Sequence, residues 1–370
     1  MREGWEYKKL GEVCEIYQPK TLSTDMLTKT GGYPVYGANG IIGYYNQYNH
    51  EEQEVLLTCR GATCGTVNIS KPYSWINGNA MVIHRKSEEM DFNFLKYLML
   101  SLDYSLIITG AAQPQITRQK LAPTKIKIPP KSTQLAIVSE LDKINELIRL
   151  KKEQLKDYDN LAQSIFYEMF GDPVENDKEW EVKKIGDLAI VKTGPFGSML
   201  HKEDYITDGI PLVNPIHMKN FKIVPDMEFT ISKEKACELE NYMLQNNDVV
   251  FARRGDIGRC AIVSEIEKGY LCGTGSLFVR FTEDIESVFI MYIIRSESFS
   301  KHLVSKAKGA TMLNINSNTI ADLEIPLPPL PLQHLFAQRI EQIERQKPAV
   351  QKSITDLETL LASRMQYWFE

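Results

Sequence analysis

The sequence lacks any segment that is apolar enough to cross a membrane. Its longest strongly apolar stretch, around residues 288–294, is far shorter than the roughly 20 residues that a membrane-spanning helix needs. The first residues, Met-Arg-Glu-Gly-Trp, are charged and do not resemble a secretion signal. We therefore expect a soluble, cytoplasmic protein with no membrane partner.

The residue spacings of metal sites are also missing. The six cysteines include no Cys-x-x-Cys pair, and the six histidines show no His-x-x-x-His or Glu-x-x-His spacing. Only Cys59 and Cys64 lie close together, and no second Cys or His pair follows at the spacing of a zinc site. We expect reduced thiols, no metal site and no cofactor.

Common catalytic motifs are absent as well. Asn214-Pro215 is followed by Ile216, whereas a base-flipping adenine methyltransferase usually has proline and an aromatic residue there. The single Pro-Asp pair, Pro225-Asp226, is not followed by the Asp/Glu-x-Lys of common metal-dependent nucleases, and no phosphate-binding Gly-x4-Gly-Lys-Ser/Thr loop occurs. The sequence therefore predicts a protein without catalytic activity of its own.

An excess of positive charge is missing too. The chain carries 43 Lys and Arg against 48 Asp and Glu, a net charge of -5. Proteins that depend on phosphate contacts are usually basic, so the charge balance argues against nucleic acid as a partner. A DNA-binding role requires locally clustered basic groups, base contacts or other subunits.

What the sequence does contain is an internal repeat. Residues 5–13 recur as residues 180–188, both opening Trp-Glu and both containing Lys-Lys. Arg60-Gly61 returns as Arg254-Gly255, and Gly110 before Ile116 returns as Gly309 before Ile315. From Gly110 onward the copies align at a single offset of 199 residues. Because 370 residues exceed what one core usually organises, we expect two copies of one domain design.

Each copy ends in a long heptad pattern. Steps of four and three residues from Ile137 reach nine apolar positions in ten, and the equivalent steps from Phe336 reach eight in ten. The predicted helix seam comprises Ile137, Leu141, Ile144, Ile148, Leu155, Ile165, Ile340, Ile343, Val350, Ile354, Leu357 and Leu361. Such a pattern is typical of coiled-coil helices. We expect Gly171 and Pro173 to end the first helix, and Pro348 to kink the second helix or to start a new segment.

The pattern predicts an α+β fold. Two globular mixed α/β domains, residues 1–130 and 172–332, are separated by two long antiparallel coiled-coil helices, residues 131–171 and 333–370, with pseudo-two-fold symmetry. Antiparallel pairing of the helices suits two separate half-sites, as in symmetric DNA-binding dimers.

The ordered, repeated motifs resemble the specificity subunit of a type I restriction-modification system. They are the Trp-x-x-Lys-Lys-Leu/Ile-Gly openings, the Arg-Gly pairs, the stretch from Ile325 to Gln333 and the long helix after it. The resemblance implies two target-recognition domains that each read one half of a split double-stranded DNA sequence. It also implies a prokaryotic cytoplasmic protein whose partners are two modification (methyltransferase) subunits and, in the restricting complex, restriction subunits.

Base edges and phosphates are contacted by Arg, Lys, Asn, Gln and small polar residues, so glycine-bearing polar loops are the candidate DNA-reading segments. In the first copy the candidates are Asn39, Arg60, Thr63, Asn77, Asn79, Gln113, Gln115 and Arg118. In the second copy they are Lys192, Ser198, Arg253, Arg254, Arg259, Asn314 and Asn316. Residues shared by the copies, such as Arg60 and Arg254, favour a scaffold or phosphate role, whereas residues that differ, such as Gln115, favour sequence choice.

The helices are expected to act as a ruler between the half-sites. Inserting four residues near Lys151 adds about 6 Å to a helix, which predicts a spacer longer by nearly two base pairs. The outer helix faces, including Glu140, Lys143, Glu153 and Lys156, are expected to be solvated or to contact partner subunits. A two-headed protein scaffold with no DNA role is the main alternative, and the acidic balance favours it. An active site built from the thiols or histidines is the weaker alternative.

Overall fold

The computed structural model describes residues 4–110, 113–255, 257–282, 285–306 and 314–370, and the backbone alone for Ser198. The repeat residue Gly309 lies outside the described residues. The chain divides into two compact units. Unit 1 comprises Met1–Lys152 with Gln351–Glu370, and unit 2 comprises Glu153–Val350. The two long helices therefore contribute to both units.

Unit 1 opens with short strands and closes with helices, in the following order. The elements are β1 (Glu6–Lys9), α1 (Leu10–Val13), β2 (Cys14–Tyr17), the 3-10 helix η1 (Thr24–Met26), β3 (Tyr33–Gly37), β4 (Gly40–Tyr45), β5 (Val55–Thr58), β6 (Val67–Ile69), β7 (Trp75–Ile76), β8 (Ala80–Arg85), α2 (Phe92–Ser101), α3 (Arg118–Leu121), β9 (Lys125–Ile128) and α4 (Lys131–Phe170).

The core of unit 1 forms on both sides of one antiparallel sheet with the order β2-β8-β5-β6. All four residues of β5 are buried, as expected for an apolar strand covered on both faces. Val55 and Leu57 on one face pack with α2 and the start of α4, whereas Leu56 on the other face packs with Tyr36 of β3. The second sheet, with the order β4-β3-β7, thus covers one face, and the helices cover the other.

Unit 2 repeats these elements and adds others. The elements are β10 (Val182–Lys184), α5 (Ile185–Leu188), β11 (Ala189–Thr193), η2 (Gly197–Met199), η3 (Lys202–Asp204), β12 (Tyr205–Ile206), β13 (Ile210–Val213), η4 (Pro215–His217), β14 (Met218–Lys219), β15 (Lys222–Ile223), β16 (Thr230–Ile231), α6 (Lys233–Glu238), η5 (Glu240–Tyr242), β17 (Val249–Ala252), β18 (Cys260–Ile262), β19 (Leu271–Cys272), β20 (Ser276–Phe281), α7 (Ser287–Arg295), α8 (Glu297–Lys306), α9 (Ser317–Ala321), β21 (Glu324–Pro326) and α10 (Leu330–Phe369).

The sheets show that the two units share one topology. The order β11-β20-β17-β18 in unit 2 corresponds strand by strand to β2-β8-β5-β6 in unit 1. The parallel pair β13 and β19 corresponds to the parallel pair β3 and β7, and β10 with β21 corresponds to β1 with β9. The additional strands of unit 2 lie between β11 and β17. The predicted duplication is therefore a duplication of fold.

A buried glutamine fixes the base of each long helix. Gln134 is 2% exposed, donates to the carbonyl oxygens of Pro129 and Glu89, and accepts from the N–H of Asp91 just before α2. Gln333 is 1% exposed and makes the equivalent bonds with Pro328 and Glu286. Buried polar backbone groups need such partners, so the repeated Pro-Pro and Gln letters encode the same joint between long helix and recognition unit.

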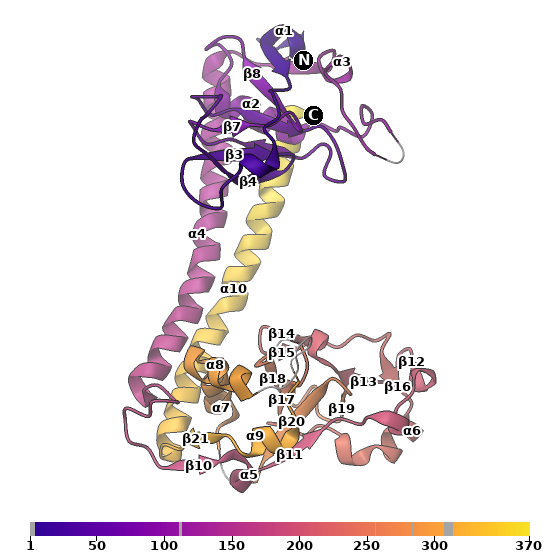
Figure 1. The fold of residues 1–370 in the computed structure, drawn as a ribbon, viewed down its shortest axis with the longest axis vertical. Coiled ribbons are helices and arrows are strands. Elements are labelled where there is room, and N and C mark those ends of the chain that lie inside the picture. Colours follow the sequence, from indigo (N-terminus) through magenta and orange to yellow (C-terminus); the bar gives the residue numbers. More distant parts are fainter. Residues whose placement is uncertain (1–3, 111–112, 256, 283–284, 307–313) are drawn as a thin grey trace. The chain divides into compact units, whose positions relative to one another are not determined.

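Within each unit, part of α10 runs antiparallel to part of α4 (Figure 1). In unit 1, Lys152 pairs with Glu358 and Glu140 pairs with Arg364. In unit 2, Lys347 pairs with Asp159 at 2.8 Å. Of the twelve seam residues named from the sequence, eight are buried and four are half-buried; the half-buried ones are Leu155, Ile165, Leu357 and Leu361.

Helix α4 ends where its glycine signal lies. Gly171 follows the last helical residue, has a φ of +76°, and donates its N–H to the carbonyl of Tyr167. A positive φ of this size favours glycine and ends the helix. The prediction for Gly171 is confirmed.

Of the two effects predicted for Pro348, the start of a new segment is wrong, and a kink stays a prediction. Helix α10 continues from Leu330 to Phe369 with Pro348 inside it. Proline removes one helical N–H donor. Ile343, before the proline, is buried in the unit 2 core with Ala162 and Phe166 of α4, and Val350, after it, is buried too, so the apolar seam favours helix on both sides of Pro348.

Candidate nucleic-acid interface

The loops that carry most candidates of the first copy meet at one end of the four-stranded sheet of unit 1. We call them loop cluster 1, which consists of residues 18–22, 38–39, 60–66, 77–79 and 113–118. Two of these loops are hydrogen-bonded to each other. Arg60 and Gln115 form an antiparallel bridge, and the N–H of Gly61 donates to the carbonyl of Pro114 at 3.0 Å. The backbone N–H of Cys59 reaches the carbonyl of Asn79 at 3.3 Å. Segments distant in sequence thus form one surface.

Two further contacts complete loop cluster 1. Asn68 donates to the Asn39 side chain at 3.0 Å, which holds the tip of the β3–β4 hairpin. Gln18 donates to the carbonyl of Gly78 at 2.9 Å. The candidate side chains that lie exposed on this surface are Asn39, Arg60, Thr63, Asn79, Gln113, Gln115 and Arg118. Exposed amides and guanidinium groups of this kind can contact base edges and phosphates.

Unit 2 forms the equivalent surface, loop cluster 2, from residues 194–197, 214–216, 253–255, 257–259, 273–275 and 314–316. Arg254 and Asn314 form the antiparallel bridge that corresponds to Arg60 and Gln115. The N–H of Arg253 donates to the carbonyl of Gly275 at 3.1 Å, as Cys59 does to Asn79 in unit 1. The same strand ends therefore present loops in both units.

Positive charge gathers on loop cluster 2. Arg254 is exposed, Arg253 is half-buried with its Nε 3.4 Å from the Asn314 side chain, and Arg259 donates to the carbonyl of Pro215 at 3.2 Å. Burial and then the neighbouring charge of Arg254 lower the pKa of Arg253. Adjacent guanidinium groups of this kind attract an anionic ligand such as a phosphate.

Four candidates differ from the exposed loop side chains described above. Asn77 is 3% exposed and accepts from the N–H of Leu22, so its side chain holds the chain after β2. Asn316 caps α9 by accepting from Thr319. Lys192 lies over the ring of Tyr242, with its ammonium 5.0 Å from the ring centre. The side chain of Ser198 lies outside the described atoms.

The sequence matches the family described as Type I restriction modification DNA specificity domain over residues 2–157 and again over residues 177–358. This chain therefore belongs to that family. The two matches coincide with the two copies of the repeat, so the chain is a type I restriction-modification specificity subunit with two target-recognition domains.

Full-length relatives agree with this assignment. A putative type I restriction enzyme specificity subunit of Haemophilus influenzae is 24% identical and covers 92% of this chain and 87% of the relative. The MjaVIII specificity subunit of Methanocaldococcus jannaschii is 21% identical and covers 92% and 86%. Both relatives are named specificity subunits. As predicted, this specificity subunit is a recognition protein rather than an enzyme.

Two solved structures share the fold. The S subunit from M. genitalium is 13% identical, with a TM-score of 0.58, and covers 99% of this chain and 96% of that chain. A chain from a study of complex assembly and conformational transition of the type I R-M system is 17% identical, with a TM-score of 0.64, and covers 99% and 97%. The predicted arrangement of two mixed α/β domains with two long helices is confirmed.

Within the described ranges, no group of three His, Cys, Asp or Glu side chains could hold a metal ion. None of the described helices combines the length and the apolar character needed to cross a bilayer.

Sequence reasoning missed some residues of the surface and misplaced another. Gln18 and the exposed Lys20 belong to loop cluster 1, and the signal was their position at the end of an edge strand, as for Gly194 in the second copy. Glu140 is not on an outer helix face, because it binds Arg364 and accepts from the indole of Trp368. The Arg364 guanidinium holds the pKa of Glu140 below its usual range.

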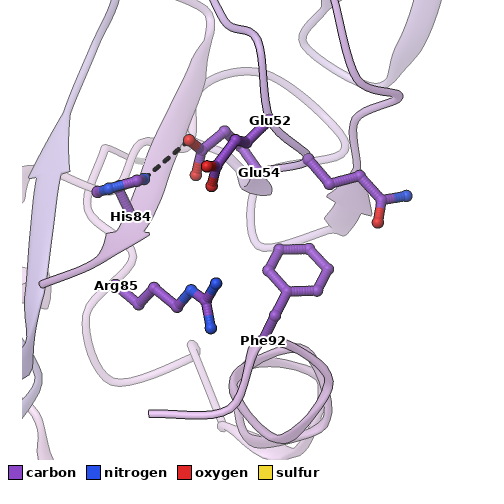
Figure 2. A pocket seen from close by; sticks show the side chains of 6 residues that line it. Glu52, Glu54, His84, Arg85 and Phe92 are labelled. Atoms are coloured by element: carbon purple, nitrogen blue, oxygen red, sulfur yellow. Dashed lines mark hydrogen bonds and ion pairs between the residues drawn. The ribbon is translucent and has the colours of Figure 1, made fainter. Parts of the chain in front are cut away.

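A separate pocket of about 250 Å³ lies at the other end of the unit 1 sheet. Figure 2 shows its carboxylates, Glu52 and Glu54, with the ring of His84 directed toward Glu54 and with Arg85 and Phe92 nearby. Glu54 is 5% exposed and lies 2.8 Å from His84, and burial raises its pKa. In unit 2 the corresponding pair is Asp248 and Arg280. The charged pair in this pocket therefore differs between the two units, and the pocket is not part of the loop surface.

Proposed function

We propose that loop clusters 1 and 2 each read one half of a bipartite double-stranded DNA target. The observation that carries this proposal is the recurrence of one exposed, polar loop surface at the same strand ends in both units. Different side chains on equivalent loops allow the two units to read different half-sites. The exposed candidates of each cluster contact bases or phosphates. Arg60 and Arg254 contact phosphates, because the backbone of each belongs to the scaffold that the two units share.

The long helices set the unread spacer and dock two methyltransferase subunits. Apolar side chains exposed on the helices support docking. A single exposed leucine is common on a protein surface, but several exposed leucines on two helices suit the binding of a helical partner. In unit 1 these are Leu135, Leu147, Leu150 and Leu360, and in unit 2 they are Leu161 and Leu335; each is at least 42% exposed. Restriction subunits join the restricting complex, in the cytoplasm of a prokaryotic cell.

The direct test uses the full chain purified with its methyltransferase subunits. Gel shifts with random duplex DNA, with and without the subunits, measure binding, and single-molecule sequencing of methylated adenines in the host genome gives the target. The proposal expects two short specified sequences separated by a fixed spacer. A complex with no DNA affinity, or methylation at one continuous site, would refute it and favour a protein scaffold.

A further inference from the structure

Two large apolar side chains are exposed on loop cluster 2. Neither is among the polar residues that the sequence predicts as DNA contacts. Phe196 is 58% exposed and follows β11, and Ile216 is 68% exposed in the loop after β13. Single exposed apolar residues are common on proteins. These two differ because both loops contact the same turn, residues 273–275.

Close backbone contacts fix both loops against that turn. A Cβ added to Gly194 would lie 2.1 Å from the carbonyl oxygen of Gly273, and a Cβ added to Gly275 would lie 3.0 Å from the ring of Pro215. The Asn214 side chain accepts from the N–H of Gly275 at 3.1 Å. Loops packed this closely hold Phe196 and Ile216 in place, so their exposure is a property of the folded surface.

Two arginines adjoin these loops. The backbone N–H of Arg253 donates to the carbonyl of Gly275, and the guanidinium of Arg259 donates to the carbonyl of Pro215, next to Ile216. A ligand that suits this surface therefore presents anionic and apolar groups side by side. Duplex DNA does so in the major groove, where phosphates flank the 5-methyl group of thymine, the apolar feature that side chains read there.

Loop cluster 1 has polar residues at the equivalent places. Lys20 and Thr21 follow β2, and Asn39 lies in the hairpin after β3. The two recognition units thus share a backbone arrangement but differ in the chemistry of their loop tips. Amide tips suit adenine edges, whereas apolar tips suit thymine methyl groups.

We propose that Phe196 and Ile216 are specificity-determining residues that contact thymine 5-methyl groups in the half-site read by unit 2. This inference rests on the proposed function of loop cluster 2. It assigns the second half-site at least one A·T pair that is recognised through its thymine, and it assigns the first half-site a recognition that is dominated by polar contacts.

The test measures the affinity of the full complex for its mapped target after each thymine is replaced in turn by uracil, which removes only the methyl group. For a contacted thymine we expect a loss of about fourfold, the factor for one buried methyl-sized group. All sensitive thymines should lie in one half-site. Because the protein is unchanged, this measurement does not depend on the folding of a variant.

Variants then connect the effect to the two residues. The double variant Phe196→Ala/Ile216→Ala should bind the target at least roughly tenfold more weakly and should bind thymine and uracil targets equally. Ile190→Ala and Ile266→Ala are matched controls, since both residues are exposed, apolar and in unit 2, but lie near the Asp248 end of the sheet. The controls should retain wild-type affinity and uracil sensitivity.

The outcomes separate this inference from the proposed function. A wild-type complex without specific DNA affinity would contradict the proposed function itself. Specific binding that changes by less than about twofold at every uracil, or a second half-site made only of G·C pairs, would overturn the thymine contact alone. Uracil sensitivity that persists in the double variant would assign the methyl contact to other residues and would also overturn it.

Discussion

The two recognition units share the hydrogen bonds that satisfy their backbone groups. They differ in the side chains at the loop tips and in the partner of one buried carboxylate. Gln134 and Gln333 each bind the carbonyl of a proline and the N–H just before a helix, and the Arg60–Gln115 and Arg254–Asn314 bridges occupy the same place. At the opposite end of the sheet, buried Glu54 pairs with the imidazole of His84 in unit 1, whereas buried Asp248 pairs with the guanidinium of Arg280 in unit 2. Duplication therefore preserved the joints and allowed the loops and the charge pair to diverge.

The largest expected effect breaks the charge pair of unit 2. Asp248 is 1% exposed and binds Arg280 through two oxygens at 2.9 and 2.7 Å. Asp248→Asn leaves the guanidinium without its counter-ion, and we expect unit 2 to lose about 3 to 5 kcal/mol. Glu54→Gln should cost unit 1 only about 1 kcal/mol, because an amide still accepts from His84.

Denaturant unfolding followed by hydrogen exchange in peptides of each unit checks this contrast. Equal losses in the two units would show that the divergence of the pair has no energetic consequence.

Replacing the glutamine at either helix joint should lower stability, and the loss should be larger in unit 1. Gln134→Leu leaves three buried or part-buried backbone groups without partners and should cost about 3 kcal/mol, whereas Gln333→Leu leaves two and should cost about 2 kcal/mol. Urea unfolding measures both values. The exposed Gln53 gives the control variant Gln53→Leu, which should change stability little. A cost below about 1 kcal/mol for either buried glutamine would contradict its role as a joint.

Sequence choice should change in one half-site at a time. Gln115→Ala removes an exposed amide from loop cluster 1, and we expect about 1 to 3 kcal/mol less discrimination at the first half-site only. Gln53→Ala, at the far end of the same unit, is the matched control. Mapping of methylated adenines measures the result, and unchanged specificity at that half-site would remove Gln115 from the reading surface.

The smallest expected effect is a pH response of unit 1. Burial and then the charge of His84 lower the pKa of His50 to about 4, while Tyr17 lies 2.9 Å from its Nε2. The unfolded chain, with an ordinary histidine pKa near 6.5, takes up a proton first as the pH falls. Stability is therefore lost between about pH 6.5 and 4, on the order of 1 kcal/mol after allowance for the half-exposed ring.

His50→Gln should flatten this loss, measured as the difference in unfolding free energy between variant and wild type across that pH range. Identical pH profiles would show that His50 carries none of the dependence.

The repeat made most of the fold predictable, because Trp5 and Trp180, Arg60 and Arg254, and the two heptad seams mark equivalent elements directly in the sequence. Strands β12, β14, β15 and β16 were not predicted, since they have no counterpart in the first copy to align with. A new segment at Pro348 was wrongly predicted, because the local cost of proline is visible in the sequence, whereas the burial of Ile343 and Val350 on either side of it is not.

The candidate site was predictable only in part. Polar residues next to glycine, such as Asn39 and Gln115, indicated the loops, but nothing in the sequence shows that Asn77 is buried. Phe196 and Ile216 look like core residues in sequence, and only their exposure distinguishes them. Burial and exposure depend on contacts between distant segments, which periodicity does not encode.

The central proposal is that the long helices set the length of the spacer between the two half-sites. We would insert seven residues after Lys152 in α4 and seven after Val350 in α10, because whole heptads keep the seam in phase. Each helix gains about 10 Å, so the mapped target should keep both half-sites and gain about three base pairs of spacer. A spacer of unchanged length in a complex that still methylates DNA would contradict the claim.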